Sequence, residues 1–125
     1  MNTKKLTIGE SELEIMKVLW NSSSPITSVD IGNAVQAHGW KKTTIATFLT
    51  RLTEKGAIAA KKDGKLYYYS PCITEDEYRK LRTGNLINNL YHGSVKELAV
   101  SLFRDKNLTP DDIEELRSMF FEKEE

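Results

Sequence analysis

The strongest constraint on the fold comes from residues 41–56, KKTTIATFLTRLTEKG, because they combine a regular apolar stripe with a polar front. The stripe has the i, i+3, i+4, i+7 spacing of one helix face. It is formed by Ile45, Phe48, Leu49 and Leu52. Gly56 suits the position just after a helix end, where the backbone often turns left-handed. We therefore predict an amphipathic helix that buries this stripe.

The segment that follows, AIAAKKDGKLYYYSP, predicts a β-hairpin. Two extended runs are joined by Asp63-Gly64, a pair typical of a two-residue type I′ turn. Three lysines surround that turn, so the tip of the hairpin is predicted to be basic. They are Lys61, Lys62 and Lys65. Taken alone, such lysines are also typical of a solvated hairpin edge with no binding role.

Two shorter helices are predicted before the amphipathic one. ESELEIMKVLWNS has apolar residues at helical spacing and acidic residues in its first turn. TSVDIGNAVQAHG follows a break, with Thr27 as N-cap and with Ile31, Ala34 and Val35 expected to face inward. Three helices followed by a basic hairpin is the winged helix-turn-helix plan, in which the third helix enters the major groove. We place this DNA-binding domain at residues 1–72.

The face opposite the apolar stripe is small and rich in hydroxyl groups. It carries Thr43, Ala46, Thr47, Thr50 and Glu54, with Thr44 and Arg51 beside it. A helix with such a face can lie deep in a major groove, where threonine bonds a phosphate or a base edge and its methyl meets a thymine methyl. A solvated helix face without a binding role is the alternative.

Residues 73–125 are predicted to form three more helices, each with its own N-cap signal. Three helices of this size bury too little surface to make a stable core alone. We therefore expect this second domain to pair with a second copy of the chain, the alternative being that it folds back on the first domain in a monomer. The residues expected in the dimer interface are Leu86, Leu90, Leu98, Leu102, Phe103, Ile113, Leu116 and Phe120.

Composition and charge narrow the class of protein. A chain of 125 residues fits one typical domain or two very small ones, and no apolar run approaches membrane-spanning length. We expect a cytoplasmic protein without stable membrane association. The net charge is zero, yet residues 1–72 carry ten basic and six acidic residues, whereas residues 73–125 carry eight and twelve. This asymmetry favours a first half that faces nucleic acid.

Residues that could carry chemistry are sparse, so we predict neither an enzyme nor a bound cofactor. His38 and His92 are far apart in the sequence and belong to no metal-ligand motif. The sequence also shows no phosphate-binding glycine loop and no nucleophile elbow. A single cysteine, Cys72, excludes an internal disulfide and a cysteine-rich metal cluster, and we expect it to be half-buried at the domain junction.

Four segments resemble the BlaI/MecI repressors of β-lactam resistance, within the wider group that includes CopY. They are ELEIMKVLW, KKTTIATFLTRLTEKG, KKDGKLYYYSP and LTPDDIEELRSMF, and the likeness runs from about Leu6 to Phe121. The resemblance implies a mainly α fold with a small β-hairpin, namely a winged-helix DNA-binding domain followed by a C-terminal helical dimerisation domain. It further implies a homodimeric transcriptional repressor that binds inverted-repeat operators built around TACA and TGTA half-sites.

Carried over by position, the resemblance implies a set of DNA-binding residues on the third helix and on the wing. The set is Lys41, Lys42, Thr43, Thr44, Ala46, Thr47, Arg51, Lys61, Lys62 and Lys65. Thr43 and Ala46 stand where relatives often have longer polar or basic side chains. The details of base reading are therefore expected to differ from those of the relatives.

The resemblance also implies a route of induction. The β-lactam members are switched off when the signal of a membrane sensor leads to proteolysis of an Asn–Phe bond in the dimerisation domain. The aligned bond here is Ser101–Leu102, which departs from that pair, so this route and a different one both stay open. Members that respond to copper carry Cys-x-Cys motifs near the C-terminus, and RSMFFEKEE has none.

Two alternatives from other classes remain, a winged helix that binds proteins and a winged-helix regulator that responds to a small molecule. A protein-binding surface would more often expose aromatic or large apolar anchors, whereas this one is predicted to expose lysines and threonines. No distinctive pocket residues support the second alternative.

Overall fold

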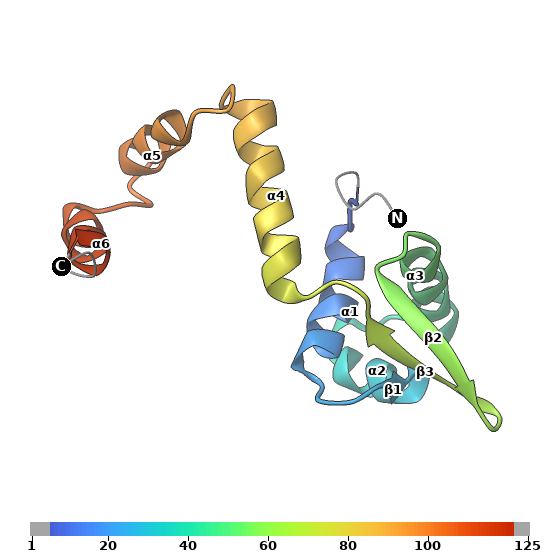
Figure 1. Cartoon of the computed structure of the whole chain (residues 1–125). Helices are drawn as coiled ribbons and strands as arrows, with labels where there is room; N and C mark the ends of the chain where they lie inside the picture. The colour runs from blue at the N-terminus through green and yellow to red at the C-terminus, as the bar shows by residue number, and fades with distance from the viewer. Residues whose placement is uncertain (1–5, 122–125) are drawn as a thin grey trace. The chain divides into compact units, whose positions relative to one another are not determined.

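The computed structural model describes residues 6–121, which form a mainly helical chain with one small antiparallel sheet (Figure 1). The elements lie in an order that confirms the winged-helix plan. They are α1 (Glu10–Asn21), β1 (Ile26–Thr27), α2 (Ser28–Ala34), the 3₁₀ turn η2 (Gln36–His38), α3 (Lys42–Glu54), β2 (Ile58–Asp63), β3 (Leu66–Pro71), α4 (Glu75–Leu90), α5 (Val95–Arg104) and α6 (Pro110–Phe121).

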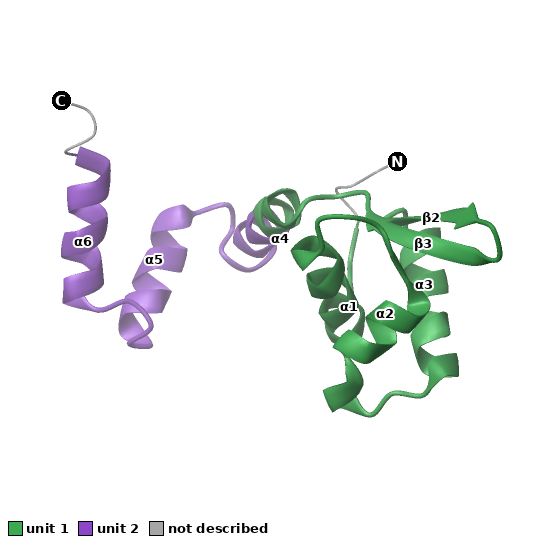
Figure 2. Cartoon of the chain, turned by 90° about the horizontal axis from the view of Figure 1, so that it is seen from below, with its two compact units in different colours: residues 1–81 green, residues 82–125 purple. Residues whose placement is uncertain are grey.

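The chain divides into two compact units, unit 1 up to Leu81 and unit 2 from Arg82 onward (Figure 2). This division falls nine residues after the domain boundary expected at 72/73. The physical reason is that the first turns of α4 belong to the core of unit 1. Tyr78 is 7% exposed there, and Leu81 packs against the same core. Each unit is described by itself below.

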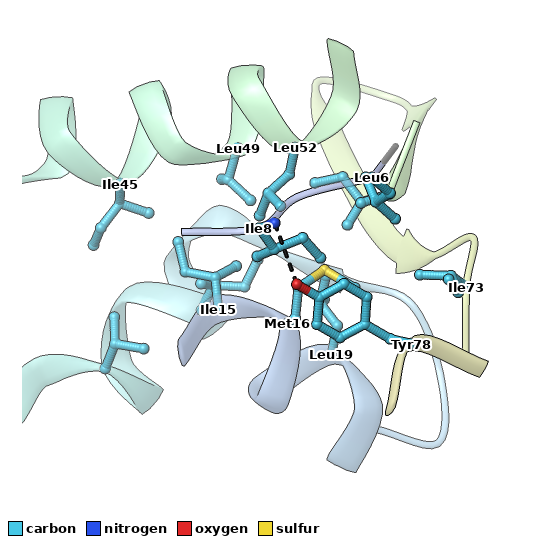
Figure 3. Packing of buried hydrophobic residues seen from close by; sticks show 14 residues of the cluster. Leu6, Ile8, Ile15, Met16, Leu19, Ile45, Leu49, Leu52, Ile73 and Tyr78 are labelled. Carbon is cyan, nitrogen blue, oxygen red and sulfur yellow. Dashed lines mark hydrogen bonds between the residues drawn. The ribbon is translucent and has the colours of Figure 1, made fainter. Parts of the chain in front are cut away.

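The core of unit 1 is built from one apolar face of each helix (Figure 3). Its five fully buried large side chains come from α1, α2 and α3. They are Ile15, Met16, Leu19, Ile31 and Leu52. Leu6 and Ile8, just before α1, are also buried, although the helical spacing used to predict the core gave no sign of them. Burial of such side chains supplies the main stabilising free energy of a domain this small.

The second helix is shorter than the sequence predicts. Thr27 is its N-cap as expected, accepting a hydrogen bond from the Asp30 N–H at 3.3 Å. The α-helix ends at Ala34, and the chain then tightens into η2 before Gly39 turns left-handed at φ 69°. Because the helix stops there, Ala34 is exposed, and its predicted inward position is wrong.

The sheet has the strand order β1-β3-β2, and the short strand β1 was not predicted. In the hairpin, Asp63 pairs with Leu66, so the turn consists of Gly64 and Lys65 rather than Asp63 and Gly64. Of these two residues only Gly64 has a positive φ, 66°. A type I′ turn needs positive φ at both central residues, so the predicted turn type is wrong, and glycine at the first position fits type II′.

Two hydrogen bonds tie the start of α4 and the residues before it to α1 and the N-terminal segment. The Trp20 indole N–H donates to the Ile73 carbonyl at 2.8 Å. The Ile8 N–H donates to the Tyr78 hydroxyl at 3.2 Å (Figure 3). Cys72 is exposed, so its predicted half-buried position is wrong. Its backbone N–H bonds the Ala57 carbonyl, while the neighbouring Ile73 fills the core instead.

Unit 2 consists of well-capped helices with little packing among them. Ser94 accepts from the Glu97 N–H at 3.1 Å, and Thr109 accepts from the Asp112 N–H at 3.1 Å. From residue 82 to 121, no residue is buried. Eleven large apolar side chains of this unit are exposed, from Leu102 at 37% to Leu90 at 67%. A single copy of unit 2 therefore has no hydrophobic core.

Candidate nucleic-acid interface

Helix α3 presents the threonine-rich face to solvent because its opposite face is fixed in the core. Ile45, Leu49 and Leu52 are 7%, 2% and 0% exposed, as their spacing predicts. The side chains predicted to bind DNA lie on the outer side of the helix. Lys41, Lys42, Thr43, Ala46, Thr47 and Arg51 are exposed, and Thr44 is half-buried.

The hydroxyl of Thr47 is already engaged within the helix. It donates to the Thr43 carbonyl at 3.0 Å. Mid-helix threonines often bond the carbonyl four residues earlier in this way. In this rotamer the side chain of Thr47 exposes its methyl group and an acceptor oxygen but no free hydrogen-bond donor. Such a side chain suits a thymine methyl or a base amino group.

The β2–β3 hairpin forms the wing, and its three lysines are all exposed. Lys61 and Lys62 lie on β2, and Lys65 lies in the turn itself. The Lys62 Nζ atom lies 5.9 Å from the centroid of the Tyr67 ring, a cation–π contact that restrains this lysine. Leu66 and Tyr67, next to the turn, are 51% and 50% exposed. Neither residue was predicted to belong to the interface, although an apolar pair beside a hairpin turn can be recognised in the sequence.

The charges of the predicted interface are available to a ligand. Among residues 6–121, no ion pair involves any of its six basic side chains. They are Lys41, Lys42, Arg51, Lys61, Lys62 and Lys65. A basic side chain without an acidic partner can pair with a phosphate without first breaking an ion pair, and neutralising the phosphate releases counterions condensed on the DNA. The absence of an ion pair distinguishes these six side chains from Lys17 and Lys80, which pair with acidic residues on their own helices.

An aromatic stack that the sequence did not reveal holds the start of α3. His38 stacks on Trp40 at a centroid distance of 4.4 Å, and the Trp40 ring meets Phe48 edge-on at 5.1 Å. Offset and edge-on aromatic pairs stabilise by about 0.5–1.5 kcal/mol beyond area burial. Trp40 directly precedes the N-cap of α3, so this stack fixes where the helix begins.

An ion pair between a buried glutamate and an exposed lysine holds the other end of α3. The Lys55 ammonium, at the C-cap of the helix, lies 2.6 Å from the Glu12 carboxylate on α1. Burial alone would raise the pKa of the Glu12 carboxyl, but Lys55 and the Gly9 N–H outweigh it and hold the pKa below its ordinary value of 4.5. Arg51 acts in the same direction. Glu12 is therefore charged at neutral pH.

The residues predicted for dimerisation and cleavage lie in unit 2. Seven of the eight dimerisation residues are exposed, and Leu98 is half-buried. The Ser101–Leu102 bond lies within α5, and the Ser101 hydroxyl accepts a hydrogen bond from the Tyr91 hydroxyl at 3.1 Å. A protease would therefore have to unwind part of α5 to reach this bond.

In residues 6–121, no three or more His, Cys, Asp or Glu side chains gather in a way that could hold a metal ion. Within the same range, every helix is too short or too polar to cross a membrane.

Comparisons with known proteins agree with this geometry. A model of the penicillinase repressor family matches residues 8–122. The penicillinase repressor of Bacillus licheniformis is 33% identical over 109 residues, which cover 87% of this chain and 85% of that protein. The methicillin resistance regulatory protein MecI of Staphylococcus aureus is 31% identical over 123 residues, covering 98% of this chain and all of that protein.

Two solved structures resemble unit 1. One is the solution structure of the DNA-binding domain of the repressor BlaI, with a TM-score of 0.52 and 37% identity over 58% of this chain and 88% of that one. The other is monomeric Bacillus licheniformis BlaI in complex with the blaP half-operator, with a TM-score of 0.50 and 38% identity over 58% and 89% of the two chains.

Proposed function

The chain belongs to the penicillinase repressor family, and from that premise we propose that it represses transcription as a homodimer bound to an inverted-repeat DNA operator. It is a DNA-binding, non-enzymatic regulator of the BlaI/MecI type. In the proposed mechanism α3 enters the major groove of one half-site, and the wing lysines contact the adjacent phosphates. The bound dimer then excludes the polymerase from the promoter.

The outer face of α3 is the observation that carries the DNA part of the proposal. It combines small hydroxyl side chains with basic residues that are free of ion pairs within residues 6–121. Small side chains permit close approach to base edges, while the basic ones contribute affinity for any duplex. A relative 38% identical to this chain is solved on a half-operator, which supports the same use of unit 1 here.

The absence of buried residues between positions 82 and 121 supports the proposed homodimer. Apolar side chains on α5 and α6, including Phe103 at 47% and Phe120 at 64% exposure, are left uncovered by residues 6–121 of one chain. Covering them with a second copy would give the two-fold symmetry that an inverted repeat requires. Each subunit would then read one half-site.

Loss of the dimer would end repression. We propose that a protease activated through a membrane sensor cuts within α5, at Ser101–Leu102, and so separates the apolar residues on the two sides of the bond. The Leu102 carbonyl accepts hydrogen bonds from the Asn107 and Leu108 N–H groups at 2.9 and 3.0 Å, which close the end of α5. A cut before Leu102 would detach this cap from the rest of the helix.

A fluorescence-anisotropy titration tests the proposal directly. The chain would be titrated into a duplex with an inverted TACA/TGTA repeat, a duplex with one half-site, and a scrambled duplex. We expect tight binding to the repeat at two subunits per duplex, and weaker binding to the single half-site. Equally weak binding to all three would refute it. In that case the exposed Leu66 and Tyr67 would favour a wing that binds protein.

A further inference from the structure

The Glu12 side chain is a buried carboxylate that DNA does not reach. Glu12 is 6% exposed, and its Oε1 atom accepts from the Gly9 N–H at 2.8 Å and from the Lys55 ammonium at 2.6 Å. Its other oxygen, Oε2, is buried without any hydrogen-bond partner among residues 6–121. The bond to the Gly9 N–H belongs to a capping box at the start of α1, which accounts for a glutamate at this position. It does not account for burial of the charge against Lys55 with one oxygen unsatisfied, which costs free energy.

The ion pair is a polar, directional contact between α1 and α3. The two residues are 43 positions apart in the sequence, Glu12 in the first turn of α1 and Lys55 at the C-cap of α3. Apolar side chains of the same two helices, such as Ile15 and Leu52, belong to the buried core. Apolar contacts are not directional and tolerate small rotations, whereas a charge-assisted hydrogen bond fixes distance and angle.

A small rotation of α3 about its axis would disturb base reading. Side-chain tips lie about 5–6 Å from the axis of a helix, so a rotation of roughly 10° moves them by about 1 Å. A shift of that size takes a hydrogen bond out of its effective range. Arg51 lies one turn before Lys55 on the same helix, and its positive charge also helps to lower the pKa of the Glu12 carboxyl.

We propose that Glu12 is a positioning residue for operator recognition, which fixes the rotation of α3 through its bond to Lys55 so that the threonine face meets the base edges in register. The inference rests on the proposed DNA-binding function. It assigns sequence discrimination to a side chain on α1 that contacts no DNA.

Substitution of Glu12 by glutamine separates this role from simple electrostatics, because the two predict opposite signs. Glu12→Gln removes a negative charge, so electrostatics alone would tighten binding to every duplex. If Glu12 positions α3, Glu12→Gln instead lowers affinity for the operator by roughly tenfold, comparable to the loss of one good base contact. Affinity for the scrambled duplex stays within about twofold or rises.

The matched control is Glu10→Gln, two residues earlier in the first turn of α1. It makes the same change of charge, but Glu10 is exposed and forms no ion pair among residues 6–121. Its ratio of operator to scrambled affinity should equal that of the unmodified chain. Circular dichroism at the assay temperature and stoichiometric titration would correct each affinity for the folded, active fraction.

The double variant Glu12→Gln/Lys55→Met covers the case in which the single variant does not fold. It replaces the ion pair by neutral groups of similar size, a change that folded proteins often tolerate, and glutamine can still accept from the Gly9 N–H. The double variant should show the same loss of the operator-to-scrambled ratio. An unchanged ratio in the folded variants, or an equal fall for both duplexes, would overturn the inference. If the unmodified chain shows no preference for the operator, the proposed function itself fails.

Discussion

The wing lysines make a quantitative prediction about salt. Lys61 and Lys62 are exposed and have no acidic partner within residues 6–121, so each is expected to contact one phosphate. Each phosphate contact contributes about −0.9 to the slope of log K against log salt. Lys61→Ala removes one contact per subunit, so the slope for a dimer on a full operator becomes shallower by about 1.8.

That change is large enough to measure by fluorescence anisotropy. Raising salt fourfold, from about 50 to 200 mM, weakens binding by a factor of about 3.5 for each contact, so the variant loses about twelvefold less affinity than the unmodified dimer. On a duplex with one half-site and one bound subunit, the slope should change by only about 0.9. Operator and scrambled duplexes should be affected alike, because phosphate contacts carry no sequence information.

Lys80→Ala is the control for this experiment. It removes the same charge from a lysine that pairs with Asp76 on α4 at 3.3 Å. Its slope should stay within the error of the unmodified chain. The reasoning is refuted if Lys61→Ala and Lys80→Ala change the slope equally, or if Lys61→Ala leaves the slope unchanged. Lys62→Ala should behave as Lys61→Ala does, although it also breaks the contact with the Tyr67 ring.

Three other perturbations test separate parts of the molecule. Thr47→Ala removes an exposed methyl and an acceptor oxygen, so the operator-to-scrambled ratio should fall by roughly tenfold at an unchanged salt slope, and an equal loss on both duplexes would contradict this. Phe120→Asp should convert the dimer to a monomer in sedimentation, whereas Val29→Asp, at the same 64% exposure in unit 1, should not. Backbone hydrogen bonds at helix N-caps lower the pKa values of Glu77 and Asp112 from 4.5 and 3.8. The stabilising effect of these two carboxylates is complete above their ordinary pKa values and is lost as pH falls through their lowered pKa values in the folded chain. The thermal midpoint of unfolding should therefore fall in acid. A thermal midpoint that stays flat between pH 5 and about 2 would refute the assignment.

Local patterns in the sequence were enough to predict the helices that position the candidate interface. The stripe from Ile45 to Leu52 predicted which side of α3 is buried, because a helix repeats its faces at a fixed angle. Thr27 predicted the start of α2, because its hydroxyl bonds a neighbour three residues away. Both signals act within one turn of helix and need no knowledge of the rest of the fold.

Features that depend on distant partners were not predictable in this way. The pairing of Glu12 with Lys55 joins residues 43 positions apart, and a glutamate in the first turn of a helix reads as a simple dipole effect. The strand β1 exists only because Ile26 pairs with Tyr69. The turn was misplaced by one residue because Asp63-Gly64 and Gly64-Lys65 are both acceptable turn pairs, and the choice is made by strand register.

We expect the stability of unit 2 to depend on concentration, because none of its side chains up to Phe121 is buried within one chain. With a second copy as the covering surface, the folded dimer and the operator-bound complex both follow mass action. As the amount of repressor falls, dimers disappear faster than chains do, and the uncovered α5 and α6 become substrates for general proteolysis. Repression of this kind would fall more steeply than in proportion to the amount of protein.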